Sequence, residues 1–533
     1  MSLPATSTYA PERPLERWAP WLCAALLLVL ATALRLWSIQ RVNGNVFYDA
    51  AVRTMGRSWH ALFFGALEPG GSVSIDKPPV DLWLQVASTK ALGFTLFGLH
   101  LPEALGGVAA CGLLFGALRR PFGLVTALAA ALALAVLPVS VLTARSDTMD
   151  SVLAALLIGS LWLSFAALES GRLRWSVLAA ATMGLAFNVK LTEALIALPA
   201  LALVWLWSAE PTLRARLRVA GATAATFIAV ALSWTAIASL TPLGQRPFPV
   251  GSGDGSVWRV TFVYNGLNRL SNHGAIGGAA LAPGGGPSPL RLLSAGSSEL
   301  WSLVGTGVLA ASLLGLLALA ALLAQGRERL RETLRSPHGR FAVGIVVWFL
   351  TGLIVFSAMR RLQTRYLEAF TPAVCAVLGL SVGALWRGGG PRRAVLLGFL
   401  FVAFLATSLS HDFDLIRGHS SNSLQADPTS VALSRYLRAN REGARYEVAA
   451  ANINDAVGLV VRDAQPVLAM NDVDGALTRT RSLQAKVLQG QVRYYFAPHA
   501  CHGGRHCPGN QLWAYTHSDP VPGVPGLRRF DAV

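Results

Sequence analysis

The chain has 533 residues, of which 53% are hydrophobic and only 14% are charged, and its mean hydropathy is +0.48. A soluble globular domain carries about 25% charged residues, so this composition excludes an ordinary soluble protein and predicts repeated membrane spans. The net charge of +17 would suggest nucleic acid in a soluble protein, but here much of the Lys and Arg stands in short connectors between apolar runs, as the positive-inside rule predicts. We therefore expect the lipid bilayer as a partner and no nucleic acid.

About eleven apolar stretches are long enough to cross a bilayer as helices. The first follows Arg13 and Arg17, and the small-residue triplet Ala31-Thr32-Ala33 lies inside it, so we expect an uncleaved span with a cytoplasmic N-terminus. The expected spans are 19–37, 102–118, 122–142, 151–168, 175–189, 192–208, 219–240, 298–324, 341–358, 366–386 and 394–410.

Segment 81–98 is ambiguous, because charged and amide side chains interrupt its apolar residues. If this segment crossed the membrane, the later basic connectors would all fall outside; if it lies along the interface as an amphipathic helix, they all fall inside. The second threading obeys the positive-inside rule, and we adopt it. The outer face then receives the long loops 38–101 and 241–297, the turns at 143–150, 189–192 and 359–365, and the tail.

We expect two domains, a transmembrane domain over 1–410 and an extracytoplasmic domain over 411–533. The outer loops of the first domain are expected to form the site. Loop 241–297 is rich in glycine, so we expect little regular structure there. It fits either a cover over a substrate or a linker, and interspersed aromatic residues such as Trp258 favour the cover.

The tail alternates strand-like and helix-like segments. Tyr446–Ala451, Val467–Met470 and Val492–Phe496 are typical of strands, and Asn454–Arg462 and Arg481–Gly490 are typical of helices. Alternation of this kind predicts a small α/β domain with a parallel sheet.

The tail also contains cysteines and histidines at close spacing. Zinc ligands occur at such spacing, but disulfides persist outside the cytoplasm, so a Cys501–Cys507 bridge is favoured over a metal or free thiols. The residues concerned are His499, Cys501, His502, His506 and Cys507.

Ionisable residues gather where the spans end on the outer face. Charges at membrane depth are costly and are functional by default. One or two carboxylates with several cations suit transfer from an activated donor: a carboxylate takes a proton from an acceptor hydroxyl, and Lys and Arg stabilise a leaving phosphate. Simpler alternatives are local ion pairs and contacts with lipid phosphate, namely Asp76–Lys77, Arg145–Asp147, Lys190–Glu193 and Arg360/Arg361 with lipid.

Several stretches carry a specific resemblance. They resemble the bacterial C-type (GT-C) glycosyltransferases, which are related to protein O-mannosyltransferases and to the aminoarabinose transferase of lipid A, and in particular the glycosyltransferase family 39 branch. The resemblance implies a GT-C fold, a polyprenyl-phosphate-sugar donor, transfer on the outer face with inversion, and two helices lying along the membrane in the first outer loop. The stretches are Phe47–Val52, Ser58–Gly65, Ser74–Pro79, Thr148–Ser151, Phe187–Lys190, Gln245–Pro247, Tyr264–Leu267 and Gly490–Phe496, within 19–497.

The resemblance also assigns roles. Lys77, in a K-P-P motif, would contact the donor phosphate, and Asp150 would support the same region. Relatives carry an acidic residue a few positions before the tyrosine that matches Tyr48, where this chain has Asn43-Gly44-Asn45-Val46. Asp49 follows the tyrosine instead and is our candidate for the catalytic base. Asp147 and Asp150 are the alternatives, and an inactive enzyme is a further one.

The leading hypothesis is a membrane glycosyltransferase that moves a sugar from a polyprenyl-phosphate donor to a glycan, lipid or protein acceptor at the outer face of the cytoplasmic (inner) membrane. No cofactor is required, because the cations can replace a metal at the phosphate, although the pattern also accommodates a divalent cation. The alternatives are a transporter or flippase of lipid-linked sugar and a catalytically degenerate binding protein of the envelope. The expected substrate-binding residues are Tyr48, Lys77, Arg145, Asp147, Lys190, Arg246, Tyr264, Arg361, Arg365 and Tyr366.

Overall fold

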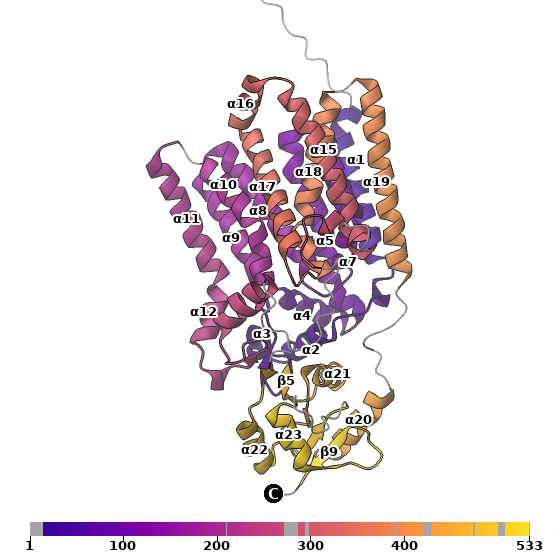
Figure 1. Cartoon of the computed structure of the whole chain (residues 1–533). Coiled ribbons are helices and arrows are strands. Elements are labelled where there is room, and N and C mark those ends of the chain that lie inside the picture. The colour runs from indigo at the N-terminus through magenta and orange to yellow at the C-terminus, as the bar shows by residue number, and fades with distance from the viewer. Residues whose placement is uncertain are drawn as a thin grey trace, which may run out of the picture.

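The computed structural model describes residues 14–208, 211–270, 286–293, 298–388, 390–418, 424, 428–472, 475–498 and 507–531. Long helices stand side by side as a bundle, and a smaller α/β part lies beyond one end of it (Figure 1). Between the two parts lie three short helices, α2 (Val46–Met55), α3 (Trp59–Phe64) and α4 (Val80–Leu92).

Six helices in the described part of the chain are long and apolar enough to cross a membrane, or up to nine if each of three bent pairs is one span. Every predicted span coincides with helix. The prediction has about eleven spans because it counts α9 and α10 separately and includes α18, which is shorter than the other spans. The unbroken helices are α1 (Pro14–Leu36), α5 (Leu96–Phe122), α8 (Asp150–Ser170), α15 (Thr306–Leu323), α17 (Pro337–Ala358) and α19 (Pro391–Arg417), with α18 at Thr371–Arg387.

One of the bent pairs breaks at a proline. Pro138 separates α6 (Leu124–Val136) from α7 (Pro138–Ala144) at 60°, because proline removes a donor and clashes with the preceding turn. The other two pairs bend by 94° and 49°. They are α9 (Leu173–Lys190) with the 3₁₀ turn η2 (Leu191–Ile196) and α10 (Leu198–Ser208), and α11 (Leu213–Ala231) with α12 (Ser233–Leu240).

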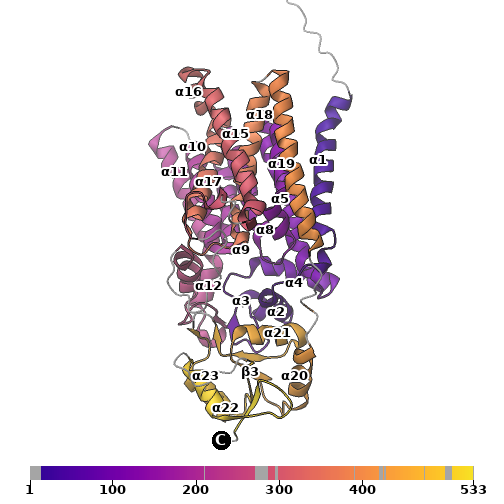
Figure 2. The same ribbon diagram turned by 45° about the vertical axis from the view of Figure 1, so that its right-hand side comes forward.

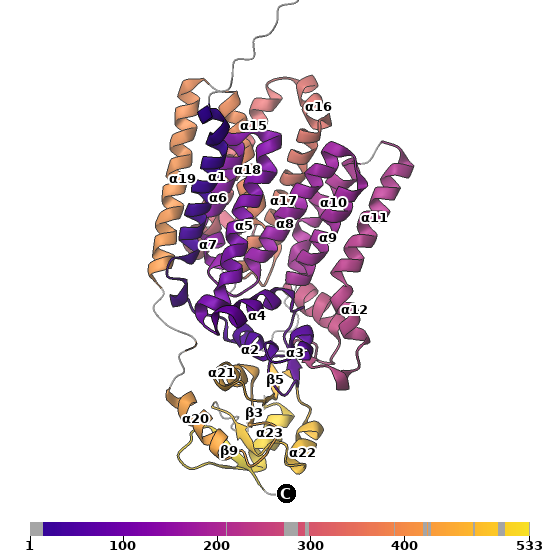
Figure 3. The same ribbon diagram turned by 180° about the vertical axis from the view of Figure 1, so that it is seen from behind.

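The ambiguous segment is a helix lying across the end of the bundle. Figure 3 shows α4 running transverse to the long helices, as the charge pattern predicted. It begins directly after Pro78-Pro79 and ends at Leu92, so the prediction of one helix through residue 98 is wrong. Gly93, with φ +84°, stops α4, and Thr95 then caps α5 by accepting the N–H of Gly98. The basic helix α16 (Arg327–Arg335) lies at the opposite end of the bundle.

The described parts of loop 241–297 have more regular structure than its glycine content suggested. Strand β2 (Phe248–Pro249) pairs in parallel with β1 (Val73–Ser74) of the first loop. A π-helix follows at Arg259–Leu267, and α13 (Asn268–Leu270) continues it. Gly251, Gly253 and Gly255 have positive φ, a conformation that glycine adopts without steric cost, and all three lie in the turn between β2 and the π-helix. Most of the later glycines of this loop lie outside the described residues.

The C-terminal part is an α/β domain with a five-stranded sheet in the order β4-β3-β7-β9-β8 (Figure 2). The predicted strands appear as β3 (Val448–Ala450), β4 (Val467–Ala469) and β7 (Tyr494–Phe496), and the predicted helices as α21 (Ile453–Asp463) and α22 (Thr480–Leu488). These three strands are parallel, but β8 (Ser518–Pro520) and β9 (Leu527–Phe530) add antiparallel pairs. The purely parallel prediction is wrong because the chain closes with a hairpin, whose strands must run in opposite directions.

The C-terminal domain rests on the loops at the end of the bundle. Arg57 of the first loop donates to the carbonyl of Ala464 at 2.7 Å, and Arg445 donates to the carbonyl of Gly70 at 3.0 Å. Helix α19 continues to Arg417, past the expected boundary at 410. Cys507 is disulfide-bonded, whereas Cys501, the three histidines of the same pattern, and Arg13 lie outside the described residues.

Candidate functional site

Charged and aromatic side chains from seven segments of the chain meet where the helices of the bundle end, next to α2 and the first loop. The segments are far apart in sequence, so only the fold brings them together. We call them the charged cluster. Its members are Tyr48, Asp76, Lys77, Asp150, Lys190, Glu193, Arg269, Arg365 and Tyr366.

Lys77 organises the first half of the cluster. Its Nζ donates to Oδ2 of Asp76 at 2.7 Å and to the hydroxyl of Tyr48 at 3.0 Å. All three side chains are buried, and Lys77 is only 7% exposed. Burial alone would raise the pKa of Asp76, but Lys77, Arg269 and Arg365 together hold it below its ordinary value. The expected Asp76–Lys77 ion pair therefore exists, and it lies inside a larger group of charges.

Lys190 organises the second half. It forms an ion pair with Asp150 and a second with Glu193, whose Oε2 lies 3.1 Å from Nζ. The ring of Tyr366 lies 5.2 Å from the same ammonium, within range of a cation–π contact. Thr148 donates to the other oxygen of Asp150 at 2.8 Å, so both oxygens of that carboxylate are held.

Unusual backbone conformations occur beside two of these residues. Met149 precedes Asp150 with φ +66°, and Leu191 follows Lys190 with φ +50°. A left-handed conformation costs a residue with a side chain about 1–2 kcal/mol, and such conformations concentrate at functional sites. Asp150 begins α8 and Lys190 ends α9, so each strained residue lies at a helix end and orients the adjacent charged side chain toward the cluster.

Two arginines connect the halves. The Arg365 guanidinium lies 6.0 Å from the Tyr366 ring centroid, and Arg269 lies 4.8 Å from that of Tyr264. Asn265 fixes the same region by donating from Nδ2 to the carbonyl of Asp76 at 2.6 Å. Burial raises the pKa of Tyr48 well above its ordinary value, so its hydroxyl keeps its proton and can act as a donor.

Asp49 lies on a different side of α2 from Tyr48 and faces Asp147. Asp49 is fully buried, and Oδ2 of Asp147 accepts the N–H of Asn45 at 2.7 Å. Burial and the neighbouring Asp147 carboxylate raise the pKa of Asp49 well above its ordinary value, because two adjacent carboxylates resist being charged together. This pair of carboxylates has no lysine or arginine ion pair among the described residues, unlike Asp76 and Asp150.

Two of the predicted arginines donate from their side chains to main-chain carbonyls, and a third contacts the cluster through its own main chain. Arg145 donates to the carbonyls of Leu34 at 3.0 Å and Trp37 at 2.8 Å and so closes the end of α1; it forms no ion pair with Asp147 among the described residues. Arg246 donates to two loop carbonyls. The N–H of Arg361 donates to the carbonyl of Arg269 at 3.4 Å, which places it next to the cluster through its main chain.

Sequence reasoning left Asp76, Glu193 and Arg269 out of the expected site. The first two were read as structural partners of neighbouring lysines, and the third was one of several loop arginines. Asp76 is buried and Glu193 is half-buried against Lys190, which distinguishes them from surface pairs, but sequence shows burial only indirectly. Asp76 precedes the lysine of the K-P-P motif, and Glu193 lies three residues after Lys190, so position relative to those lysines was the available signal.

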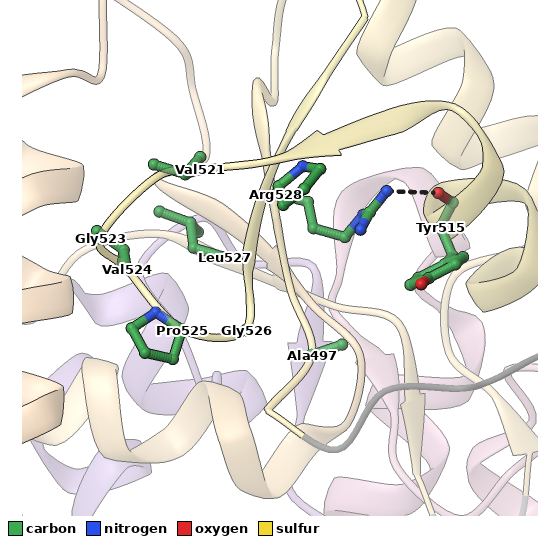
Figure 4. Close-up of a pocket in the computed structure, with 10 residues that line it drawn as sticks. Ala497, Tyr515, Val521, Gly523, Val524, Pro525, Gly526, Leu527 and Arg528 are labelled. Carbon is green, nitrogen blue, oxygen red and sulfur yellow. Dashed lines mark hydrogen bonds between the residues drawn. The ribbon is translucent and has the colours of Figure 1, made fainter.

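The C-terminal domain has a separate hollow of about 400 Å³ beside the turn between β8 and β9 (Figure 4). Among the described residues that line it, Arg528 is the one charged residue, and it donates to the carbonyl of Tyr515 at 3.1 Å while stacking on that ring. The described lining is otherwise mostly apolar and contains no carboxylate, unlike the charged cluster.

Two parts of the chain match known families. Residues 76–234 match the family described as "Dolichyl-phosphate-mannose-protein mannosyltransferase", and residues 433–517 match "Putative mannosyltransferase YkcB-like, C-terminal". Two relatives from Bacillus subtilis (strain 168) are similar: "Putative mannosyltransferase YkcB", 33% identical over 255 residues, and "Putative mannosyltransferase YycA", 34% identical over 271. These matches cover 48% and 49% of this chain but only 36% and 39% of the relatives' lengths.

Solved structures show the fold. ArnT from Cupriavidus metallidurans in the apo state aligns with a TM-score of 0.58 and 15% identity over 98% of this chain and 99% of that one. The same protein bound to undecaprenyl phosphate aligns with a TM-score of 0.55 and 16% identity over 90% of each chain. The oligosaccharyltransferase AglB from Archaeoglobus fulgidus, in complex with an inhibitory peptide and a dolichol-phosphate, gives 0.56 and 13% over 91% of this chain and 70% of that one. The GT-C fold and the resemblance predicted from sequence are confirmed.

Proposed function

We propose that this multi-pass membrane protein is a glycosyltransferase that takes its sugar from a polyprenyl-phosphate-linked donor and passes it to a hydroxyl group of an acceptor. The observation that carries the proposal is the charged cluster. Four cations and three carboxylates meet there with two tyrosine hydroxyls, leaving one positive charge in excess within this set. The two lysines and two aspartates are buried, and the other three charged residues are half-buried. Because buried charges are costly unless compensated, an excess cation in such a place favours an anionic ligand.

A phosphodiester donor has the charge and the anchor that this position requires. Its single negative charge would compensate the excess, and Lys77, Lys190 and Arg365 would surround the phosphate as it leaves with the electrons of the broken bond. Its polyprenyl chain would lie among the apolar helices. The solved neighbours that hold undecaprenyl phosphate or a dolichol-phosphate share this fold and support a lipid phosphate as ligand.

The acceptor needs a base, and Asp49 is the carboxylate best suited to that role. Asp76 is ion-paired to Lys77, which favours its charged form and weakens it as a base, and both oxygens of Asp150 are already held by Lys190 and Thr148. Asp49 faces Asp147 instead, and its raised pKa moves it toward neutral pH, where a general base is most effective. We propose that Asp49 takes the acceptor's proton in its ionised form, and that the neighbouring Asp147 carboxylate raises the affinity of Asp49 for that proton.

The proposal extends to the placement of the reaction. The cluster, the first loop and the C-terminal domain share one end of the bundle, and the basic helix α16 lies at the other. The positive-inside rule would place α16 in the cytoplasm. The reaction would then occur on the outer face of the cytoplasmic membrane, where a lipid-linked donor requires no nucleotide.

Purified full-length protein incubated with radiolabelled polyprenyl-phosphate sugars and candidate acceptors tests the proposal. We expect labelled product, with at least a hundredfold slower transfer in Asp49→Asn, since one lost general base costs about 10²–10⁴-fold. Asp414→Asn, on an exposed part of α19, is the matched control and should keep the wild-type rate. Movement of the labelled lipid across a vesicle membrane with no new glycosidic bond would contradict the proposal and favour a transporter.

A further inference from the structure

A polar cleft of about 570 Å³ lies where three parts of the chain meet, apart from the charged cluster. The parts are the first loop, the segment 244–246 and the C-terminal domain. Each contributes one guanidinium group to the lining, from Arg57, Arg246 and Arg445 respectively. A cleft assembled from three parts with one cation from each is a feature that the transfer chemistry described above does not use.

The three arginines are held in place without being neutralised. Arg57 and Arg445 each donate to a carbonyl across the domain boundary, at 2.7 and 3.0 Å, and Arg246 donates to the carbonyl of Gly255 at 3.0 Å. Carbonyl oxygens carry no full negative charge. None of the three forms an ion pair with a described carboxylate. A guanidinium has five donors, so each keeps N–H groups for a ligand.

The one carboxylate that lines the described cleft is already committed to the backbone. Glu68 is only 1% exposed, and it accepts the N–H groups of Gly70 and Ser72, each at 2.5 Å. Three arginines against one carboxylate leave the described lining of the cleft with an excess of positive charge, and His60 on the same wall adds a further polar group.

The cleft also lies within reach of the charged cluster. Ala66, on its wall, is bridged to Ser74, and Lys77 follows three residues later. A strand bridge spans about 5 Å and three extended residues about 10 Å, so the wall and the Lys77 backbone are within about 15 Å of each other. A chain-like ligand held in the cleft would therefore extend to the cluster.

We propose that this cleft binds the anionic part of the acceptor, and that the acceptor is a glycan or lipid-linked glycan carrying phosphate or carboxylate groups. The inference rests on the proposed function, since it names the acceptor class of that reaction. Arg57, Arg246 and Arg445 are positioning and specificity residues in this role. They hold the acceptor's charged groups while its neutral end extends toward the charged cluster.

Direct binding to the purified full chain tests the cleft independently of transfer. The probes are a glycerol phosphate oligomer, a hexuronic acid oligomer and a neutral hexose oligomer of equal length, measured by calorimetry in nanodiscs of neutral lipid. We expect the anionic oligomers to bind and the neutral one not to bind. The double variant Arg57→Gln/Arg445→Gln should weaken anion binding about tenfold per arginine.

Two further variants separate charge from structure. Arg57→Lys/Arg445→Lys keeps both charges and should recover most of the affinity, and Arg481→Gln removes an exposed arginine of α22 and should change nothing. Equal binding of neutral and anionic oligomers, or full binding by the glutamine double variant, would overturn the proposal. Nanodiscs with added phosphatidylglycerol distinguish the source, because competition there would identify a lipid headgroup as the anion.

The two proposals fail in different ways. If the cleft is wrong but the function is right, the glutamine double variant transfers sugar to an anionic acceptor with unchanged KM. If the function is wrong but the cleft is right, anionic oligomers bind through the arginines and no acceptor receives sugar.

Discussion

The buried ion pair Asp76–Lys77 allows the effect of Lys77 on the transfer rate to be separated from its effect on stability. Replacing Lys77 by Met leaves Asp76 buried beside the two more distant arginines alone. Breaking a buried pair from one side costs about 3–5 kcal/mol, and we expect about 3 kcal/mol here because Arg269 and Arg365 remain. Lys77→Met should therefore lower the thermal unfolding midpoint, measured by tryptophan fluorescence in detergent, as well as the transfer rate.

The double variant Asp76→Asn/Lys77→Met removes both charges, and it should return to nearly wild-type stability because replacing a buried pair by neutral groups is often close to neutral. Its transfer rate should stay about a hundredfold or more below wild type, since loss of one oriented donor to a developing oxyanion costs about 3 kcal/mol. Lys90→Met, on an exposed part of α4, is the control for loss of a lysine. Recovery of transfer together with stability in the double variant would refute a role for Lys77 at the phosphate.

Three other perturbations follow from described contacts. The transfer rate should rise with pH as Asp49 loses its proton. Asp147→Asn should move that rise to lower pH, because the neighbouring carboxylate contributes to the raised pKa of Asp49. A profile of rate against pH that does not move in this variant would exclude the coupling. Burial raises the pKa of Glu447 to about 7, so its folded-state penalty grows as pH rises from about 4.5 to 7, and Glu447→Gln should raise the thermal midpoint relative to wild type at pH 8 but not at pH 4. Ala464 ends α21 with φ +49°, so Ala464→Gly should stabilise the chain by about 0.5–1 kcal/mol in thermal unfolding, whereas Ala432→Gly in the exposed face of α20 (Pro428–Ala439) should destabilise it.

The sequence predicted the structural features that depend on hydrophobic periodicity and on the distribution of charge. It did not predict the features that depend on packing between distant parts of the chain. The transverse position of α4 followed from counting basic connectors, because membrane threading is a global constraint that local charge expresses. The positions of strands β3, β4 and β7 and their parallel direction followed from the alternation of strand-like and helix-like segments. The antiparallel edge did not, because β8 and β9 are short and carry Pro and Arg residues that do not alternate clearly.

The same limit explains the site. Lys190 and Asp150 were both expected at the outer ends of spans, and their ion pair confirms that these ends meet. Arg145 was expected at the site by the same reasoning, yet it points to the carbonyls that end α1. Sequence places a residue at a helix end but not on one side of it, and the direction of a long side chain is decided by which neighbouring helix end offers acceptors.

The composition of the charged cluster carries a further consequence for the proposed donor. Its single excess positive charge equals the charge of a phosphodiester, so the bound donor would leave the buried site close to neutral. Once the sugar has left, the phosphate becomes a monoester with a charge of about −1.5 to −2. The additional charge requires donors that are not already paired, and the protonated hydroxyl of Tyr48 beside Lys77 is one of them. Hydrogen bonds from such donors strengthen as negative charge develops on the leaving oxygen, so they stabilise the transition state more than the ground state, which is the condition for a faster reaction.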